Sequence, residues 1–248
     1  MIFLKTEKEI DELRRCNRIV ARVLKELKEA VAPGVTSSEL NERAESSLSM
    51  YGGEPAFKGY RGFPASLCTS INEQIVHGIP DGRKLKDGDI ISLDFGVRLN
   101  GFYGDAAITV AVGEIGNRAR SLLDVTEQAL YRGIEQAVVG NKLSDVCQAI
   151  QGWVEKHGFS VVRDFVGHGI GTSLHEEPQI PNFGVPLPNP RLQEGMVFAI
   201  EPMVNEGTHE MRILADGWTA VTADGKLSAH FEHTIALTRN GPVILSAW

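Results

Sequence analysis

Four acidic residues lie in apolar, strand-like stretches, where an unpaired charge is unfavourable. Asp94 interrupts "GDIISLDFGV" (residues 88–97), whose composition predicts a strand buried on both faces. Glu201 follows "GMVFAI", and Asp105 and Glu232 lie in "GDAAITV" and "FEHTIAL". Burying an ionised carboxylate without a partner destabilises the fold. Four independent cases in one chain therefore do not explain the pattern well. We therefore expect the four carboxylates to converge on one site.

Convergent carboxylates cannot all be ionised unless cations compensate their mutual repulsion. Two divalent ions would balance the four charges, and carboxylate oxygens with an imidazole suit Mn²⁺, Fe²⁺, Co²⁺ or Zn²⁺. The absence of thiolates from this set argues against a structural zinc site of the cysteine type. Two ions about 3.5–4 Å apart can bridge a water, lower its pKa and polarise an attacked carbonyl. This donor set therefore predicts a hydrolase.

Three histidines lie in loops that could complete such a site. His168, in "FVGHGIG", is the expected nitrogen ligand, because its glycine neighbours leave room for a metal ion. His77, in "IVHGIP", and His175, in "SLHEEP", each precede a proline by three residues. We expect these two to polarise a carbonyl or transfer a proton. No role in the site is expected for the remaining four histidines: His157, His209, His230 and His233.

Helices and hairpins must position these side chains. Thr6 and Glu9 have the spacing of a capping box, which predicts a helix over residues 6–31. Further helices are expected over residues 36–51, 117–139 and 143–157. The Asn-Gly pair at 100–101 joins two strand-like runs, which predicts a β-hairpin between the segments that carry Asp94 and Asp105.

The same order of elements occurs twice along the chain. "KDGDIISLDFG" aligns with "QEGMVFAIEPM", and in both copies a glycine precedes the carboxylate residue by six positions. This predicts one catalytic domain over residues 1–248, built from duplicated halves of roughly 1–115 and 116–248. The two hairpins are then expected to lie around a pseudo-twofold axis.

Composition limits the class of protein further. A net charge of −7 over 248 residues argues against nucleic acid as a specific partner, and no apolar run approaches the ~20 residues that span a bilayer. Three isolated cysteines without a CxxC pair suit a reducing compartment, so we expect a cytoplasmic protein without membrane contact. A basic cluster over residues 14–28 is expected to be the solvated face of a helix, with ribosome contact as the alternative.

Taken in order, the five proposed ligands resemble those of the pita-bread metallohydrolases. The segments "INEQIVHGIP" and "GHGIGTSLHEEP" resemble the methionine aminopeptidases in particular. The short distance from Glu201 to Glu232 leaves no space for the helical insertion of the type 2 enzymes, and the early first helix leaves none for an N-terminal extension. The resemblance is therefore to the short bacterial type 1 form. It implies an α+β fold, with a pseudo-twofold antiparallel sheet and two helix pairs on one face.

The resemblance also implies a role for each metal-site residue. Asp94 would bind one divalent ion, Asp105 and Glu232 would bridge both ions, and His168 with Glu201 would complete the second. Glu201 would in addition be the general base and proton shuttle. The ions would be Co, Mn, Fe or Zn.

Substrate contacts are implied in the same way. His175 would contact the scissile carbonyl, and His77 would lie near the scissile amide and the second substrate residue. The implied methionine pocket consists of Phe57, Tyr60, Phe63, Cys68, Leu174 and Trp218. A monovalent cation, K⁺ or Na⁺, is implied near Asn72, Gln74 and Ser228. Relatives often have tyrosine in place of Phe63 and some have cysteine in place of Phe57, so this pocket differs in shape and polarity.

The implied function is removal of the N-terminal methionine from nascent proteins and peptides by a hydroxide held between two ions, with a small second residue favoured. The enzyme is expected to be a monomer. One alternative is an X-Pro peptidase, such as prolidase or aminopeptidase P, or a creatinase-like hydrolase. Those relatives carry an extra N-terminal domain, for which this chain has no residues to spare. A second alternative is a metal-free scaffold, which should have lost ligands, whereas all five are present.

Overall fold

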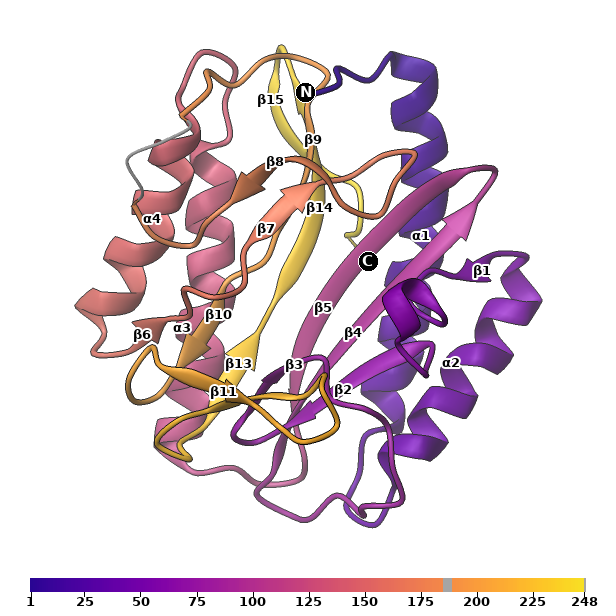
Figure 1. Ribbon diagram of the computed structural model, residues 1–248, viewed down its shortest axis with the longest axis vertical. Helices are drawn as coiled ribbons and strands as arrows, with labels where there is room; N and C mark the ends of the chain where they lie inside the picture. The colour runs from indigo at the N-terminus through magenta and orange to yellow at the C-terminus, as the bar shows by residue number, and fades with distance from the viewer. Residues whose placement is uncertain (185–188, 248) are drawn as a thin grey trace.

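Two helix pairs pack against a curved antiparallel sheet in the computed structural model, which describes residues 1–184 and 189–247 (Figure 1). The helices are α1 (Glu7–Ala30), α2 (Ser37–Tyr51), α3 (Asn117–Gln136) and α4 (Leu143–Lys156), with a 3₁₀ turn, η1 (Tyr60–Gly62). Among the described residues, none of the helices is long and apolar enough to cross a membrane.

The main sheet has the strand order β1-β4-β5-β14-β9-β7-β8, with β2 beside β4 and β15 beside β14. Its strands are β1 (Glu54–Pro55), β2 (Leu67–Ile71), β4 (Ile90–Leu99), β5 (Phe102–Ala111), β7 (Gly167–Gly169), β8 (Glu176–Ile180), β9 (Val197–Ile200), β14 (Glu232–Thr238) and β15 (Gly241–Ile244). Two small sheets have the orders β13-β10-β6 and β11-β12-β3. Their strands are β3 (Gln74–Val76), β6 (Ser160–Val161), β10 (Met203–Asn205), β11 (Met211–Ile213), β12 (Ala220–Thr222) and β13 (Ser228–His230).

Both helices of the first pair begin with the capping boxes that their sequences encode. Thr6 Oγ1 accepts from the backbone N–H of Glu9, whose carboxylate accepts in return from the N–H of Thr6 at 2.8 Å. Thr36 and Glu39 form the same arrangement at the start of α2. Each box satisfies backbone donors that a helix start leaves without partners, which confirms the predicted starts.

The third helix is shorter than its sequence predicts. It ends at Gln136, three residues before the expected boundary. The N–H of Ala137 bonds to the carbonyl of Ile134 in a tighter turn, and Gly140 follows with φ of 98°. The intervening β-branched residues, Val138 and Val139, are exposed and have no core contact that would favour continuing the helix.

Strands β4 and β5 form the predicted hairpin. Asn100 and Gly101 both have positive φ, 53° and 82°, as a turn that matches the right-handed twist of the strands requires. The register pairs Asp94 with Ala107 and Gly96 with Asp105. The two carboxylates therefore lie close along the hairpin although they are eleven positions apart in the chain.

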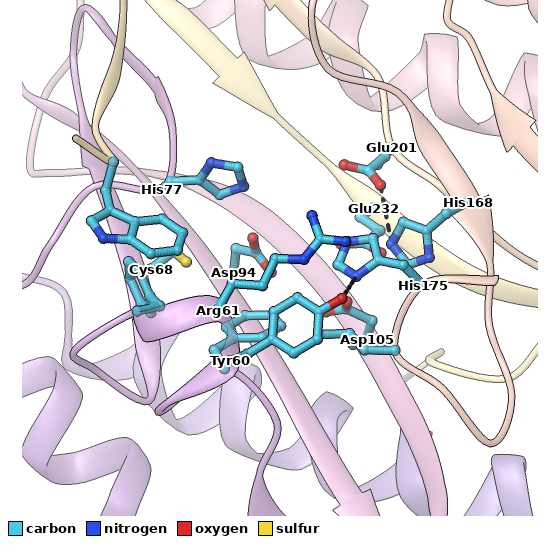
Figure 2. Close-up of a pocket in the computed structure, with 14 residues that line it drawn as sticks. Tyr60, Arg61, Cys68, His77, Asp94, Asp105, His168, His175, Glu201 and Glu232 are labelled. Atoms are coloured by element: carbon cyan, nitrogen blue, oxygen red, sulfur yellow. Dashed lines mark hydrogen bonds and ion pairs between the residues drawn. The ribbon is translucent and has the colours of Figure 1, made fainter. Parts of the chain in front are cut away.

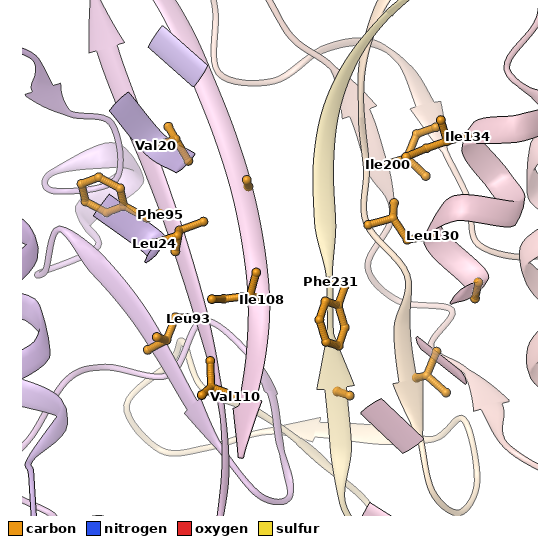
Figure 3. Close-up of a cluster of buried hydrophobic side chains, with 14 of the residues drawn as sticks. Val20, Leu24, Leu93, Phe95, Ile108, Val110, Leu130, Ile134, Ile200 and Phe231 are labelled. Atoms are coloured by element: carbon orange, nitrogen blue, oxygen red, sulfur yellow. The ribbon is translucent and has the colours of Figure 1, made fainter. Parts of the chain in front are cut away.

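The sheet is buried on both faces, as expected for the strand of Asp94, but its two faces differ in chemistry. Leu93 and Phe95 of β4 pack with Val20 and Leu24 of α1, as Figure 3 shows. In the other half, Ile200 lies in the same apolar core with residues of α3 (Figure 3). Because side chains alternate along a strand, Asp94 points to the face away from the helices. The helix-covered face thus stabilises the sheet, and the opposite face carries the polar groups.

Candidate metal centre and active site

Neighbouring strands bring the predicted ligands to the middle of the main sheet. Strand β14 pairs with β5 through Glu232 and Ala107, the partner of Asp94 across the hairpin. On its other side β14 pairs with β9, which ends directly before Glu201. Strand β7 pairs with β9 through His168 and Ala199. Residues from both halves of the chain therefore meet at one place.

The donor atoms at this place lack protein partners. Ligand atoms of Asp105, His168 and Glu232 all lie within 4.8 Å of one another. Within residues 1–184 and 189–247, the buried oxygens Asp94 Oδ1, Asp105 Oδ1 and Glu232 Oε1 have no hydrogen-bond partner. Buried polar atoms are rarely left without partners, because each one costs about 1–3 kcal/mol. Oxygen atoms gathered beside an imidazole in this way fit divalent cations of the first transition row.

His168 presents a lone pair to this cluster. Its Nδ1 lies 2.9 Å from the carbonyl oxygen of Gly169 and must donate, because a carbonyl only accepts. The Nε2 atom is then the unprotonated nitrogen and lies 3.4 Å from Oε1 of Glu201. Burial lowers the pKa of His168 to about 3, so the ring is neutral at pH 7. A neutral imidazole whose orientation a carbonyl fixes is a typical metal ligand.

Burial raises the pKa of all four carboxyl groups. That of Asp94 rises from 3.8 to about 7, and repulsion from Glu201 adds to the effect of burial. The pKa values of Asp105 and Glu232 are raised by burial and then by neighbouring carboxylates, and that of Glu201 is raised by burial. Cations are therefore required before all four groups can be ionised near neutral pH.

A pocket of about 660 Å³ opens above these ligands (Figure 2). Its walls include every residue that the sequence assigned to the metals, the chemistry or the methionine pocket: Phe57, Tyr60, Phe63, Cys68, His77, Asp94, Asp105, His168, Leu174, His175, Glu201, Trp218 and Glu232. Cys68 of this pocket is the partner of Asp94 across β2 and β4, so the apolar wall adjoins the carboxylates. The structure thus brings together all residues of the predicted site apart from the proposed monovalent cation site.

His175 lies against the predicted ligand His168, with ring centroids 4.2 Å apart. Its Nδ1 is 3.0 Å from the hydroxyl of Tyr60, and the two rings are stacked. Burial, with a contribution from the charge of Arg61, lowers the pKa of His175 to about 4. The ring is therefore neutral at pH 7, and Tyr60 fixes its orientation.

His77 is held on the opposite wall by aromatic contacts. Its ring is edge-on to Phe165 at 5.1 Å and to Trp218 at 6.4 Å, and Trp218 is in turn edge-on to Phe63 at 5.2 Å. The backbone of His77 has φ of 60°, a rare conformation for a residue with a side chain. These contacts fix the imidazole at the end of the apolar part of the pocket.

Two residues of this region, Arg61 and His230, were not predicted from the sequence. Arg61 has φ of 49° within η1 and extends its side chain into the pocket, toward His175, in Figure 2. Its position between two glycines in the loop of Tyr60 and Phe63 was the available indication. His230 was expected to have no role, but it is buried with its Nε2 only 3.6 Å from Oε2 of Glu201. His230 thus lies beside a predicted ligand, although no role in the site was expected for it.

The other discounted histidines lie outside the pocket. His157 is exposed and contacts the carbonyl of Trp153. His209 is partly exposed on the loop after β10. His233 is buried on the other face of β14 from Glu232, with its Nδ1 2.8 Å from Ser246 Oγ.

The residues proposed for a monovalent cation lie beside β13 and β3. The N–H of Ser228 donates to the carbonyl of Asn72 at 2.9 Å, and Ser228 Oγ donates to Oδ1 of Asn205 at 2.8 Å. The side chain of Gln74 accepts from the N–H of Ile71. Asn72 and Ser228 are thus neighbours, in a region separate from the pocket.

Comparison with known proteins identifies the family. The model of metallopeptidase family M24 matches residues 11–239. Methionine aminopeptidase from Clostridium perfringens is 55% identical over 246 residues, which cover 99% of each chain. Methionine aminopeptidase 1 from Bacillus subtilis is 53% identical with the same coverage. The chain belongs to the methionine aminopeptidases of family M24.

Solved structures agree with this assignment. The crystal structure of methionine aminopeptidase from Thermotoga maritima is 45% identical and has a TM-score of 0.98, with complete coverage of both chains. Prolidase from Pyrococcus furiosus has a TM-score of 0.79 at 23% identity, and only 65% of its chain is covered. The likeness to prolidase shows a common fold and does not support the X-Pro alternative.

Proposed function

We propose that this chain removes the N-terminal methionine from peptides and nascent proteins, using two divalent ions and favouring a small second residue. Its membership of the methionine aminopeptidases supports the reaction. The observation that carries the proposal is that the five predicted ligands and the six residues of the predicted methionine pocket line one pocket. A methionine side chain fits such a wall of aromatic rings and one sulfur, since thioethers pack favourably on aromatic edges.

The metal ligands divide by position. Asp94 lies at one side of the cluster, on β4, and would bind the first ion. Asp105 and Glu232 lie centrally on adjacent strands and would bridge both ions, while His168 and Glu201 on the far side would complete the second. When bound, divalent ions supply an acidified water and a Lewis acid for the scissile carbonyl.

Three side chains of the protein would transfer the proton and contact the substrate. Glu201 would take the proton of the attacking water and return it to the leaving amine, since burial makes its carboxylate more basic than an exposed one. His175, oriented by Tyr60, would donate a hydrogen bond to the oxygen of the scissile carbonyl. His77, at the end of the apolar wall, would contact the scissile amide.

The proposed preference for a small second residue rests on the fixed position of His77 in the pocket. His77 is held by Phe165 and Trp218 and cannot easily retreat from a larger side chain. Hydrolysis of Met-Ala-Ser and Met-Leu-Ser by the same metal-loaded sample tests the preference. We expect kcat/KM to fall about tenfold or more for the leucine peptide. Equal rates would show that the wall does not select against size.

The number of ions is tested separately from the reaction. Calorimetric titration of Mn²⁺ into chelator-stripped protein should show two equivalents per chain. Asp94→Asn should remove one of them, because Asp94 lies on one side of the cluster only. A single equivalent in the wild-type protein would refute the two-ion arrangement.

We further propose a monomer in the cytoplasm, formed by one domain of duplicated halves, 1–115 and 116–248. The pair β4–β5 carries Asp94 and Asp105, and the pair β9–β14 carries Glu232 and ends directly before Glu201, which supports the duplication. The three cysteines are free and buried, as suits a reducing compartment. The exposed basic face of α1 would allow transient ribosome contact. Asn72, Gln74 and Ser228 would hold K⁺ or Na⁺.

A further inference from the structure

His230 is a buried histidine that lies beside Glu201. It is the last residue of β13 and is 1% exposed. Neither ring nitrogen has a hydrogen-bond partner within the described parts of the chain. Buried donors and acceptors without partners destabilise the folded protein. An apolar residue would therefore fill this part of the core better than a histidine. Its polarity therefore points to a partner in the working site.

The backbone of His230 is fixed from two directions. Its N–H donates to Thr109 Oγ1 at 2.9 Å, and the Thr109 hydroxyl donates back to the carbonyl of His230 at 2.8 Å. The same oxygen of Thr109 is 2.9 Å from Ser92 Oγ on β4. The imidazole therefore extends from an anchored backbone, and its direction is set by the sheet.

Glu201 lies between two imidazoles. Its Oε1 is 3.4 Å from Nε2 of His168, and its Oε2 is 3.6 Å from Nε2 of His230. A shift of about 0.5 Å would bring the second pair into hydrogen-bond range. A neutral imidazole has one N–H. Placed on Nε2, the hydrogen of His230 faces a carboxylate, whereas on Nδ1 it faces no acceptor within the described residues.

We propose that His230 is a positioning residue for Glu201. Its Nε2–H donates to Oε2 and fixes the plane of the carboxylate, so that Oε1 faces the metal centre together with His168. His230 is not among the residues that line the pocket, and it lies near Oε2 of Glu201, whereas His168 lies near Oε1. The inference rests on the proposed metal centre, because Glu201 matters here as a ligand and base.

Two amide variants separate hydrogen bonding from packing. In His230→Gln the amide nitrogen occupies the place of Nε2 and can donate to Glu201. In His230→Asn the side chain is one carbon shorter, so its amide nitrogen reaches only the place of Nδ1 and cannot donate to Glu201. Each variant is assayed for kcat and KM on Met-Ala-Ser, for Mn²⁺ affinity by calorimetry, and for the thermal midpoint without metal.

We expect His230→Gln to keep kcat and Mn²⁺ affinity within about threefold of wild type. His230→Asn should lose about 10–100-fold in kcat or Mn²⁺ affinity, with KM nearly unchanged, as partners of metal ligands typically do. Thermal midpoints without metal should be similar. Equal kcat and affinity in the two variants would overturn the proposal. If His230→Asn does not fold, His230→Met, which fills the space without a donor, replaces it. Failure of the wild-type protein to release methionine would instead count against the proposed function.

Discussion

Binding of divalent ions to the stripped protein should release protons. Burial, with added repulsion from Glu201, raises the pKa of Asp94 from 3.8 to about 7, and burial raises those of the other carboxyl groups in the site. These groups therefore bind protons more tightly than exposed carboxyl groups when no cation is present. An ion binds only the ionised form, so protons and metal ions compete.

The size of this effect follows from Asp94. A group with a pKa of about 7 is about 90% protonated at pH 6 and about 10% at pH 8, so Asp94 alone would release about 0.9 proton at the lower pH and about 0.1 at the higher. The other raised carboxyl groups, which titrate together with Asp94, add in the same direction. Apparent affinity should thus rise about tenfold per pH unit or more below pH 7.

Calorimetry in buffers of different ionisation enthalpy counts these protons directly. Mn²⁺ is titrated without oxygen at pH 6, 7 and 8 in two buffers at each pH. Asp11→Asn, at an exposed position on α1, is a control that should match the wild-type protein. Binding at pH 6 with no proton release would refute the reasoning, because it would mean that the carboxylates are already ionised without a cation.

Three substitutions test other parts of the site. Glu201→Gln should lower turnover about 100-fold or more and weaken metal binding, since an amide is a poor ligand and no base; near-normal turnover would exclude the assigned role. His175→Ala should lower kcat about 100-fold at normal metal content, and loss of metal would show that His175 is a ligand. Lys5→Met breaks the buried ion pair with Glu176, next to His175, and should cost about 3–5 kcal/mol of unfolding free energy in denaturant titration. The matched change at the exposed Lys58 should cost less than about 1 kcal/mol, and equal costs would contradict the argument from burial.

The helix starts and the β-hairpin could be predicted because they depend on short sequence patterns. The capping boxes at Thr6 and Thr36 and the Asn-Gly turn act within a few residues, so their sequence patterns suffice to place helices and a hairpin. The end of α3 escaped prediction because Val138 and Val139 are apolar and suit a helix pattern, and only the tertiary structure shows that they have nothing to pack against. Family resemblance supplied the pocket residues, whose types alone indicate ordinary core.

The position of His230 beside Glu201 could not be predicted, because it depends on the pairing of strands. Since side chains alternate along a strand, His230 would face the same way as Glu232 in a continuous strand, and this was the one local indication of its position. The structure shows a break between β13 and β14 after His230, and its approach to Glu201 depends on the pairing of β10 with β13. Such contacts join segments far apart in the chain, and no local pattern records them.

Metal-dependent release of methionine tests the central claim most directly. The chelator-stripped protein is titrated with Mn²⁺ or Co²⁺ without oxygen and assayed on Met-Ala-Ser and Ala-Pro-Ala. We predict that free methionine appears from the first peptide in proportion to bound metal and that the second stays intact. Cleavage of Ala-Pro-Ala alone, or no cleavage of either peptide by protein that has bound metal, would contradict the account.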